Sequence, residues 1–120
     1  MDRGEEEMAG AFTLDKASIL ERLGGDEEIF SMMLDMYTDD VDSNCANLAR
    51  ALASGDAVTL QREVHTVKGL LATFSDDAGA AEAFAVEQKA KAGQVAGLEE
   101  AVQALQARLR EVAVVLETAR

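Results

Sequence analysis

Apolar residues recur at steps of three and four along almost the whole chain, and this spacing is what most limits its possible folds. Residues three and four apart share one face of an α-helix, whereas a half-buried strand requires alternation at every second position. We find no convincing alternation of that kind, and the sequence contains no proline to interrupt a helix. The pattern therefore predicts an all-α protein.

Glycine and aspartate residues divide the pattern into five predicted helices, because glycine ends helices and aspartate caps their first turn. The helices are predicted at about 14–23, 26–53, 56–74, 78–92 and from 95 to the end of the chain. The fourth has the weakest apolar stripe, which we place at Ala80, Ala81, Phe84 and Gln88.

Short loops between long amphipathic helices favour antiparallel packing, so we expect an antiparallel up-down four-helix bundle with a short additional N-terminal helix. A two-chain coiled coil is the alternative, but it would use one long heptad run, and this pattern breaks every 20 to 30 residues or so. Residues 13–120 are assigned to the bundle domain and residues 1–12 to a flexible acidic lead or linker.

The charge balance excludes several kinds of partner. With a formal net charge of −12, the chain would be repelled by a nucleic-acid backbone or an anionic membrane surface. Its apolar runs are far shorter than the roughly 20 residues of a membrane span. The single cysteine, Cys45, cannot form an internal disulfide and is interpreted as a small buried hydrophobe. We expect a cytoplasmic monomer that binds no nucleic acid and does not insert into membranes.

The only histidine, His65, lies in the third predicted helix. At about 100° per residue from Leu60, the apolar residues of this helix cluster near zero, while His65 falls at about 140°. The imidazole is therefore predicted to point away from the core. Gln61, Lys68, Gly69 and Ala72 share its face. Gly69 is unexpected there, because glycine inside a helix costs roughly 1 kcal/mol relative to alanine, and close approach of another molecule is the usual reason for it.

A lone histidine is most often structural or incidental, so the alternatives have to be weighed. A metal site is disfavoured because the sequence has no second histidine and no cysteine pair to complete a tetrahedral ligand set. An exposed imidazole remains, and its nitrogen can attack a phosphoryl group. Lys68, one turn along the helix, could then offset the added negative charge.

The run His65-Thr66-Val67-Lys68-Gly69 closely resembles the HxxKG signature of the histidine-containing phosphotransfer (HPt) domains of multistep phosphorelays. The resemblance covers nearly the whole chain from about Leu14. Three further segments look like the family pattern, at residues 23–26, 53–56 and 86–93. A five-residue signature is weak evidence alone. It becomes specific for the family when it lies in a helical bundle whose helices follow one another in this order.

The resemblance implies a role for each matching residue. His65 would take a phosphoryl group from the phosphoaspartate of one receiver domain and pass it to the aspartate of another. Lys68 would be the cation beside the phosphate and Gly69 the gap that admits the partner. Glu87 matches a position whose polar side chain often hydrogen-bonds the histidine ring, although a solvated helix glutamate is an equal alternative there.

The implied partners are receiver domains of response regulators or hybrid histidine kinases, and the acidic lead slightly favours a module of such a kinase. The sequence has no Gly-rich phosphate loop or kinase-type motif, so we expect no cofactor in this domain and Mg²⁺ supplied by the receiver. The candidate partner-binding residues are Gln61, Gly69, Leu70, Ala72 and Thr73.

The sequence departs from the family at Leu70 and Leu71, where small residues are usual, and at Ser75, where glycine commonly ends the segment. Two other functions were weighed. A degenerate member that keeps His65 unmodified would act only as a helical scaffold, but a scaffold has no need for His65, Lys68 and Gly69 on one exposed face. A nucleic-acid-binding helical domain is opposed by the net charge and lacks a basic stripe.

Overall fold

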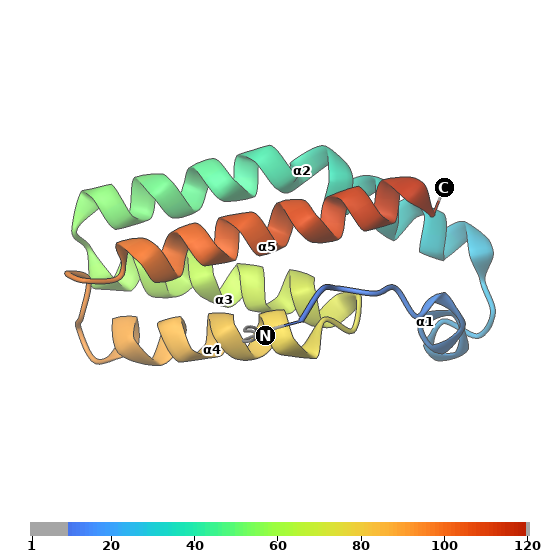
Figure 1. The fold of residues 1–120 in the computed structure, drawn as a ribbon, viewed down its shortest axis with the longest axis horizontal. Coiled ribbons are helices and arrows are strands. Elements are labelled where there is room, and N and C mark those ends of the chain that lie inside the picture. Colours follow the sequence, from blue (N-terminus) through green and yellow to red (C-terminus); the bar gives the residue numbers. More distant parts are fainter. Residues whose placement is uncertain (1–9, 120) are drawn as a thin grey trace, which may run out of the picture.

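The computed structural model describes residues 10–119, which form five α-helices joined by short loops (Figure 1). Within that range there is no strand, which confirms the predicted all-α class. None of the described helices combines the length and apolar content that crossing a membrane requires. The helices are α1 (Lys16–Arg22), α2 (Glu27–Ser54), α3 (Ala57–Thr73), α4 (Asp77–Lys91) and α5 (Glu99–Thr118).

Aspartates begin four of these helices, three of them at caps or cap regions that the sequence predicts, whereas Asp15 falls inside the first predicted helix. The carboxylates of Asp15, Asp26, Asp56 and Asp76 accept hydrogen bonds from backbone N–H groups in the first turns of α1 to α4. The last helix begins at Glu99, later than expected, because Gly97 has a φ of +83° that no α-helical residue adopts. This helix has no side-chain cap. Val95 therefore lies in the preceding loop.

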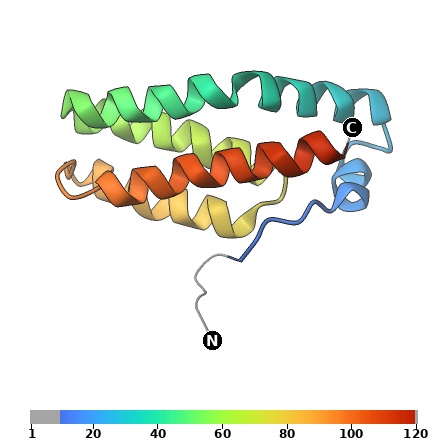
Figure 2. The same ribbon diagram turned by 45° about the horizontal axis from the view of Figure 1, so that its top comes forward.

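The helices α2 to α5 run up and down in turn, and α1 lies across the end of the bundle near the start of α2 (Figures 1 and 2). The interior is filled by the predicted apolar stripes. Tyr37 of α2 lies in it, donating its hydroxyl to the carbonyl of Leu109 at 2.9 Å and meeting Phe74 edge-on at 5.5 Å. Cys45 is buried, as expected for a small hydrophobe.

Of the four residues predicted for the core face of the fourth helix, Ala80 packs against the core and the other three do not, so the predicted orientation of this helix is wrong. Phe84 is 50% exposed, and Ala81 and Gln88 are exposed as well. In an alanine-rich helix the large residue does not have to mark the buried face, and here small residues fill the interface instead. The residues of α4 that are buried are Gly79, Ala83, Val86, Glu87 and Ala90.

A buried ion pair joins α4 to α5 and to the N-terminal segment. Arg108 donates from Nε and Nη2 to the two oxygens of Asp76, each at 2.7 Å, and from Nη1 to the carbonyl of Gly10 at 2.6 Å. A Cβ at Gly79 would collide with the Asp76 carboxylate, so this position requires glycine.

Residues 10–12, which the sequence assigned to the lead, are part of the packed structure. Phe12 is buried, and its backbone N–H donates to Glu111 at 2.7 Å. The rest of the predicted lead, residues 1–9, lies outside the described residues.

Ser75 follows α3 with a φ of +63°, in the left-handed region that favours glycine. Its hydroxyl accepts a hydrogen bond from Arg22 at 2.9 Å. The departure from glycine at this position therefore leaves the turn in its left-handed form and adds a contact to α1.

Candidate functional site

His65 lies on the outer face of α3, as its helical angle predicted. The opposite face of α3 is buried in the bundle through Leu60, Val64, Val67 and Leu71. Because these side chains fix the rotation of the helix, the imidazole of His65 remains 65% exposed. The helix thus presents a single histidine to solvent on a rigid, capped element.

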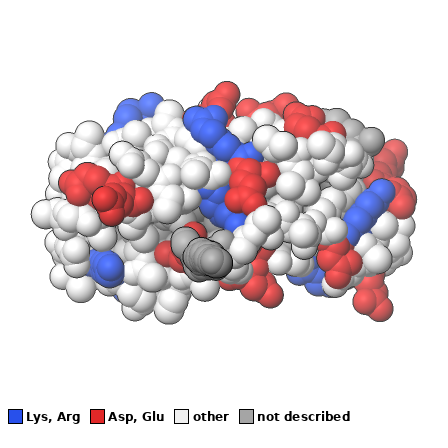
Figure 3. Space-filling view, in the orientation of Figure 1, with Lys and Arg blue, Asp and Glu red and all other residues white. Residues whose placement is uncertain are grey.

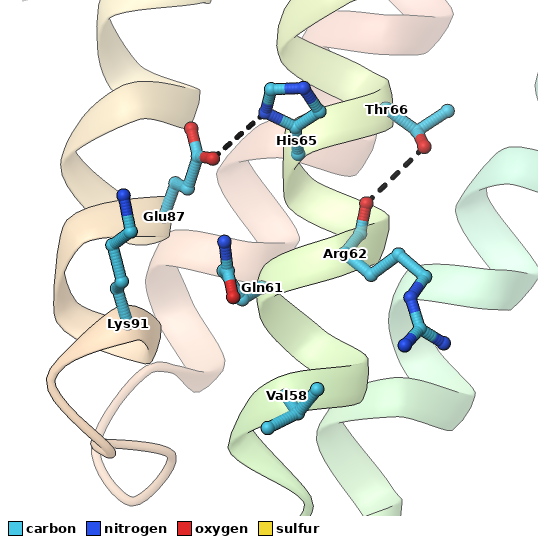
Figure 4. A pocket seen from close by; sticks show the side chains of 7 residues that line it. All are labelled: Val58, Gln61, Arg62, His65, Thr66, Glu87 and Lys91. Atoms are coloured by element: carbon cyan, nitrogen blue, oxygen red, sulfur yellow. Dashed lines mark hydrogen bonds and ion pairs between the residues drawn. The ribbon is translucent and has the colours of Figure 1, made fainter.

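Glu87 of α4 reaches the imidazole from the neighbouring helix (Figure 4). Its Oε2 lies 2.8 Å from His65 Nδ1, and its side chain is only 6% exposed. The alternative of a solvated helix glutamate therefore does not describe this residue. An ionised carboxylate can only accept hydrogen bonds, so Nδ1 carries the proton and donates it. The lone pair of the neutral ring is then on Nε2, on the side of the ring away from Glu87 (Figure 4).

Lys68 lies against the other oxygen of the same carboxylate. Its Nζ is 2.8 Å from Glu87 Oε1, and the lysine side chain is 29% exposed. The Lys68 ammonium lowers the pKa of Glu87, His65 lowers it further, and burial works in the opposite direction. The net pKa of Glu87 is below its usual value, which keeps the carboxylate ionised at neutral pH.

A shallow hollow of about 390 Å³ lies beside His65, between α3 and α4 (Figure 4). Gln61, predicted from its angle, is half-buried in its wall. Val58, Arg62 and Lys91 also line it, and the sequence analysis missed them because no motif includes them. Their spacing gave a weak signal, since Arg62 is one turn before His65 and Lys91 is one turn after Glu87.

Gly69 lies one turn beyond His65 on the exposed side of α3. A Cβ built there would meet no atom within 4 Å, so internal packing does not require glycine at this position. Ala72 and Thr73 are also exposed, and the Thr73 hydroxyl donates to the Gly69 carbonyl at 2.8 Å. These small side chains leave a low surface next to the imidazole.

The two leucines that depart from the family pattern occupy different environments. Leu71 is fully buried in the core, whereas Leu70 is half-buried and packs against its edge. The predicted partner-binding residue Leu70 therefore offers only part of its side chain to a partner.

The charges around the site differ from those of the rest of the surface. Acidic side chains crowd the end of the bundle formed by α1 and the start of α2, where Glu21, Asp26 and Glu28 are exposed (Figure 3). Around His65, by contrast, the hollow is lined by the cations Arg62 and Lys91 together with the single carboxylate of Glu87. Among residues 10–119, no cluster of three histidine, cysteine or acidic side chains could hold a metal ion.

Comparison with known proteins identifies a matching family and a matching fold. The family described as "Hpt domain" matches residues 32–114, a span that contains His65, Lys68, Gly69 and Glu87. The crystal structure of histidine-containing phosphotransfer protein B from Pseudomonas aeruginosa PAO1 has the same fold, with a TM-score of 0.79 at 20% sequence identity. The match covers 92% of this chain and 96% of that chain. No curated protein sequence matches the chain.

Proposed function

Because the chain belongs to the Hpt domain family, whose members transfer phosphoryl groups with receiver domains in phosphorelays, we propose that His65 is its phosphoacceptor. His65 takes the phosphoryl group from the phosphoaspartate of one receiver domain and passes it to the aspartate of another. The domain is then a covalent carrier between two receivers.

The observation that supports this proposal best is the exposed imidazole whose Nδ1 is held by Glu87 at 2.8 Å. With the proton fixed on Nδ1, the Nε2 lone pair forms the N–P bond while the P–O bond to the donor aspartate breaks. The aspartate leaves as a carboxylate, and the ring gains positive charge. The ionised Glu87 lies where it stabilises that charge as it develops. Transfer to the second receiver is the reverse of these steps.

Lys68 and Gly69 serve the same reaction. The Lys68 ammonium, one turn from His65, offsets the charge that the phosphoryl group adds to this face. Gly69 lets the donor's active site approach closely, since a side chain there would occupy open space above the helix. Gln61, Leu70, Ala72 and Thr73 form the surrounding contact surface, in which apolar area gives affinity and charge gives selectivity.

The receiver supplies the Mg²⁺ and the acid–base groups, so this domain needs no nucleotide, metal or other cofactor of its own. We place the reaction in the cytoplasm, with the domain acting as a monomer. It acts there either as a separate protein or as a module of a membrane-anchored hybrid kinase.

The test is incubation with a receiver domain and its kinase, followed by intact-mass measurement of the wild type and of His65→Gln. We expect one acid-labile phosphoryl adduct on the wild type and none on the variant. Val114→Ala, a change at an exposed residue of α5, is the matched control and should be labelled like the wild type. Absence of an adduct with several receivers would favour the scaffold function.

A further inference from the structure

A half-exposed aromatic ring lies beside the proposed site without any role in the core. Phe84 of α4 is 50% exposed, and the Lys68 ammonium lies over its ring, 5.2 Å from the centroid. The same ammonium is 2.8 Å from Glu87 Oε1. Lys68 is thus held from two sides by residues of one neighbouring helix.

The register of the two helices produces this arrangement. His65 and Lys68 are three residues apart on α3, and Phe84 and Glu87 are three residues apart on α4, so each pair lies on one face of its helix. The helices α3 and α4 are antiparallel neighbours (Figure 1). His65 is therefore opposite Glu87 when Lys68 is opposite Phe84. Four side chains therefore form one connected group across the interface.

A carboxylate beside an imidazole has two effects that oppose each other in this chemistry. By accepting the Nδ1 proton it fixes the tautomer and leaves Nε2 free. By its negative charge it also stabilises the doubly protonated ring, which has no lone pair to attack phosphorus. A cation on the other carboxylate oxygen reduces the second effect and leaves the hydrogen bond intact. Lys68 is in that place, at Oε1, while His65 occupies Oε2.

We propose that Phe84 is a positioning residue, whose ring holds the Lys68 ammonium on Glu87 so that this carboxylate orients His65 without drawing a second proton onto it. An aromatic face attracts an ammonium through its quadrupole and also shields it from water. The consequence for transfer rates rests on the function proposed above, but the consequence for the protonation of the ring does not.

Two cations line the hollow beside the imidazole. They are Arg62 of α3 and Lys91 of α4, and like charge opposes the addition of a second proton to an imidazole. Glu87 is the carboxylate in contact with His65, so the placement of its counter-ion decides how strongly it attracts that proton.

The single histidine makes this proposal directly measurable. Long-range ¹⁵N–¹H spectra at pH 7, on protein without a histidine tag, give the ratio of doubly to singly protonated imidazole. Lys68→Met should raise this ratio about tenfold, because the Glu87 charge is then uncompensated. Phe84→Leu, which keeps apolar bulk but removes the ring, should raise it about two- to fivefold. Phe84→Tyr should keep the wild-type ratio, and Val114→Ala serves as the surface control.

Each outcome decides part of the proposal. An unchanged ratio in Lys68→Met would overturn the neutralising role of Lys68, and an unchanged ratio in Phe84→Leu would overturn the holding role of Phe84. A ratio in Phe84→Tyr equal to that in Phe84→Leu would also overturn it. These spectra need no receiver, so they remain decisive even if the wild type accepts no phosphoryl group.

If the wild type does accept a phosphoryl group, the pH profile adds a second readout. Phe84→Leu should accept it two- to fivefold more slowly than the wild type in acidic buffer, and the two rates should converge as rising pH deprotonates the ring. A constant ratio of rates across the pH range would instead assign Phe84 to partner contact alone.

Discussion

Two buried carboxylates on one stretch of chain have opposite surroundings. Asp76, at the start of α4, has both oxygens bound by the fork of Arg108, whose side chain is 8% exposed, and it also accepts the N–H of Gly79. Glu87, three turns along, is held by Lys68 and His65, which both reach solvent. The first pair is closed off from water, whereas the partners of the second carboxylate are open to it. Asp76 is suited to holding helices together, and Glu87 to serving a reaction.

The largest effect is expected when the buried ion pair of Asp76 and Arg108 is broken. Arg108→Met leaves Asp76 buried without its counter-ion, which should lower the free energy of unfolding by about 3–5 kcal/mol. Urea denaturation measures this loss. The double variant Asp76→Asn with Arg108→Met should recover part of it, because no unpaired charge is then buried. A loss under about 1 kcal/mol in the single variant would contradict the assigned structural role.

Changing Glu87, whose partners Lys68 and His65 reach solvent, should affect the rate of phosphoryl transfer more than the stability of the fold. Glu87→Gln should slow phosphoryl transfer by about ten- to a hundredfold, since an amide can also donate and no longer fixes the proton on Nδ1. The free energy of unfolding should change by less than about 1 kcal/mol, because the amide leaves no unpaired charge buried and water can reach both freed partners. Single-turnover labelling and urea denaturation separate the two effects. Wild-type transfer by this variant would remove Glu87 from the mechanism.

Gly69 beside His65 and Gly79 beside Asp76 allow the same comparison between the reactive site and the structural ion pair. Gly69→Ala should raise the free energy of unfolding by about 0.5–1 kcal/mol, because the new methyl group meets nothing and alanine favours the helix. It should nevertheless slow transfer if a partner occupies that space. Gly79→Ala is the matched change beside Asp76 and should destabilise the fold. The thermal unfolding midpoints of both variants measure the two changes in stability. The phosphoryl labelling rate of Gly69→Ala measures the effect on transfer.

The smallest effect is the contribution of Glu87 to acid stability. Its pKa is lowered in the folded protein, chiefly by Lys68, from an ordinary value of 4.5. The ionised group therefore adds stability above that value, and this stability is lost as the pH falls through the lowered pKa. The stability of the wild type relative to Glu87→Gln should decline over that acidic interval. A difference that stays constant with pH would show that Lys68 and His65 do not stabilise the ionised form.

Much of this arrangement follows from local sequence patterns. Aspartate caps and three-four spacing predict α1 to α4 within a few residues, and the angle of His65 predicts its exposure. These features depend on neighbours within one or two turns, so a single helix contains the information. The role of Glu87 came from the family resemblance, because its burial depends on the rotation of α4.

The features that the sequence did not predict depend on contacts between different helices. The weak three-four spacing of the fourth helix places Phe84 on the core face, but small residues line the interface of α4 and leave the ring outside. The pairing of Asp76 with Arg108 joins residues on different helices, and neither residue type identifies the other. Arg108 lies beside the apolar stripe of α5, which was the only local sign of its burial.

The hydroxyl of Tyr37 on the Leu109 carbonyl has a practical spectroscopic consequence. The chain has one tyrosine and no tryptophan, so its near-ultraviolet absorbance and emission are dominated by this phenol. The signal reports the packing of α2 against α5, while His65 lies on the outer face of α3. Loss of the intact bundle would therefore change the emission, and an unchanged emission in a transfer-deficient variant would locate the defect on the surface.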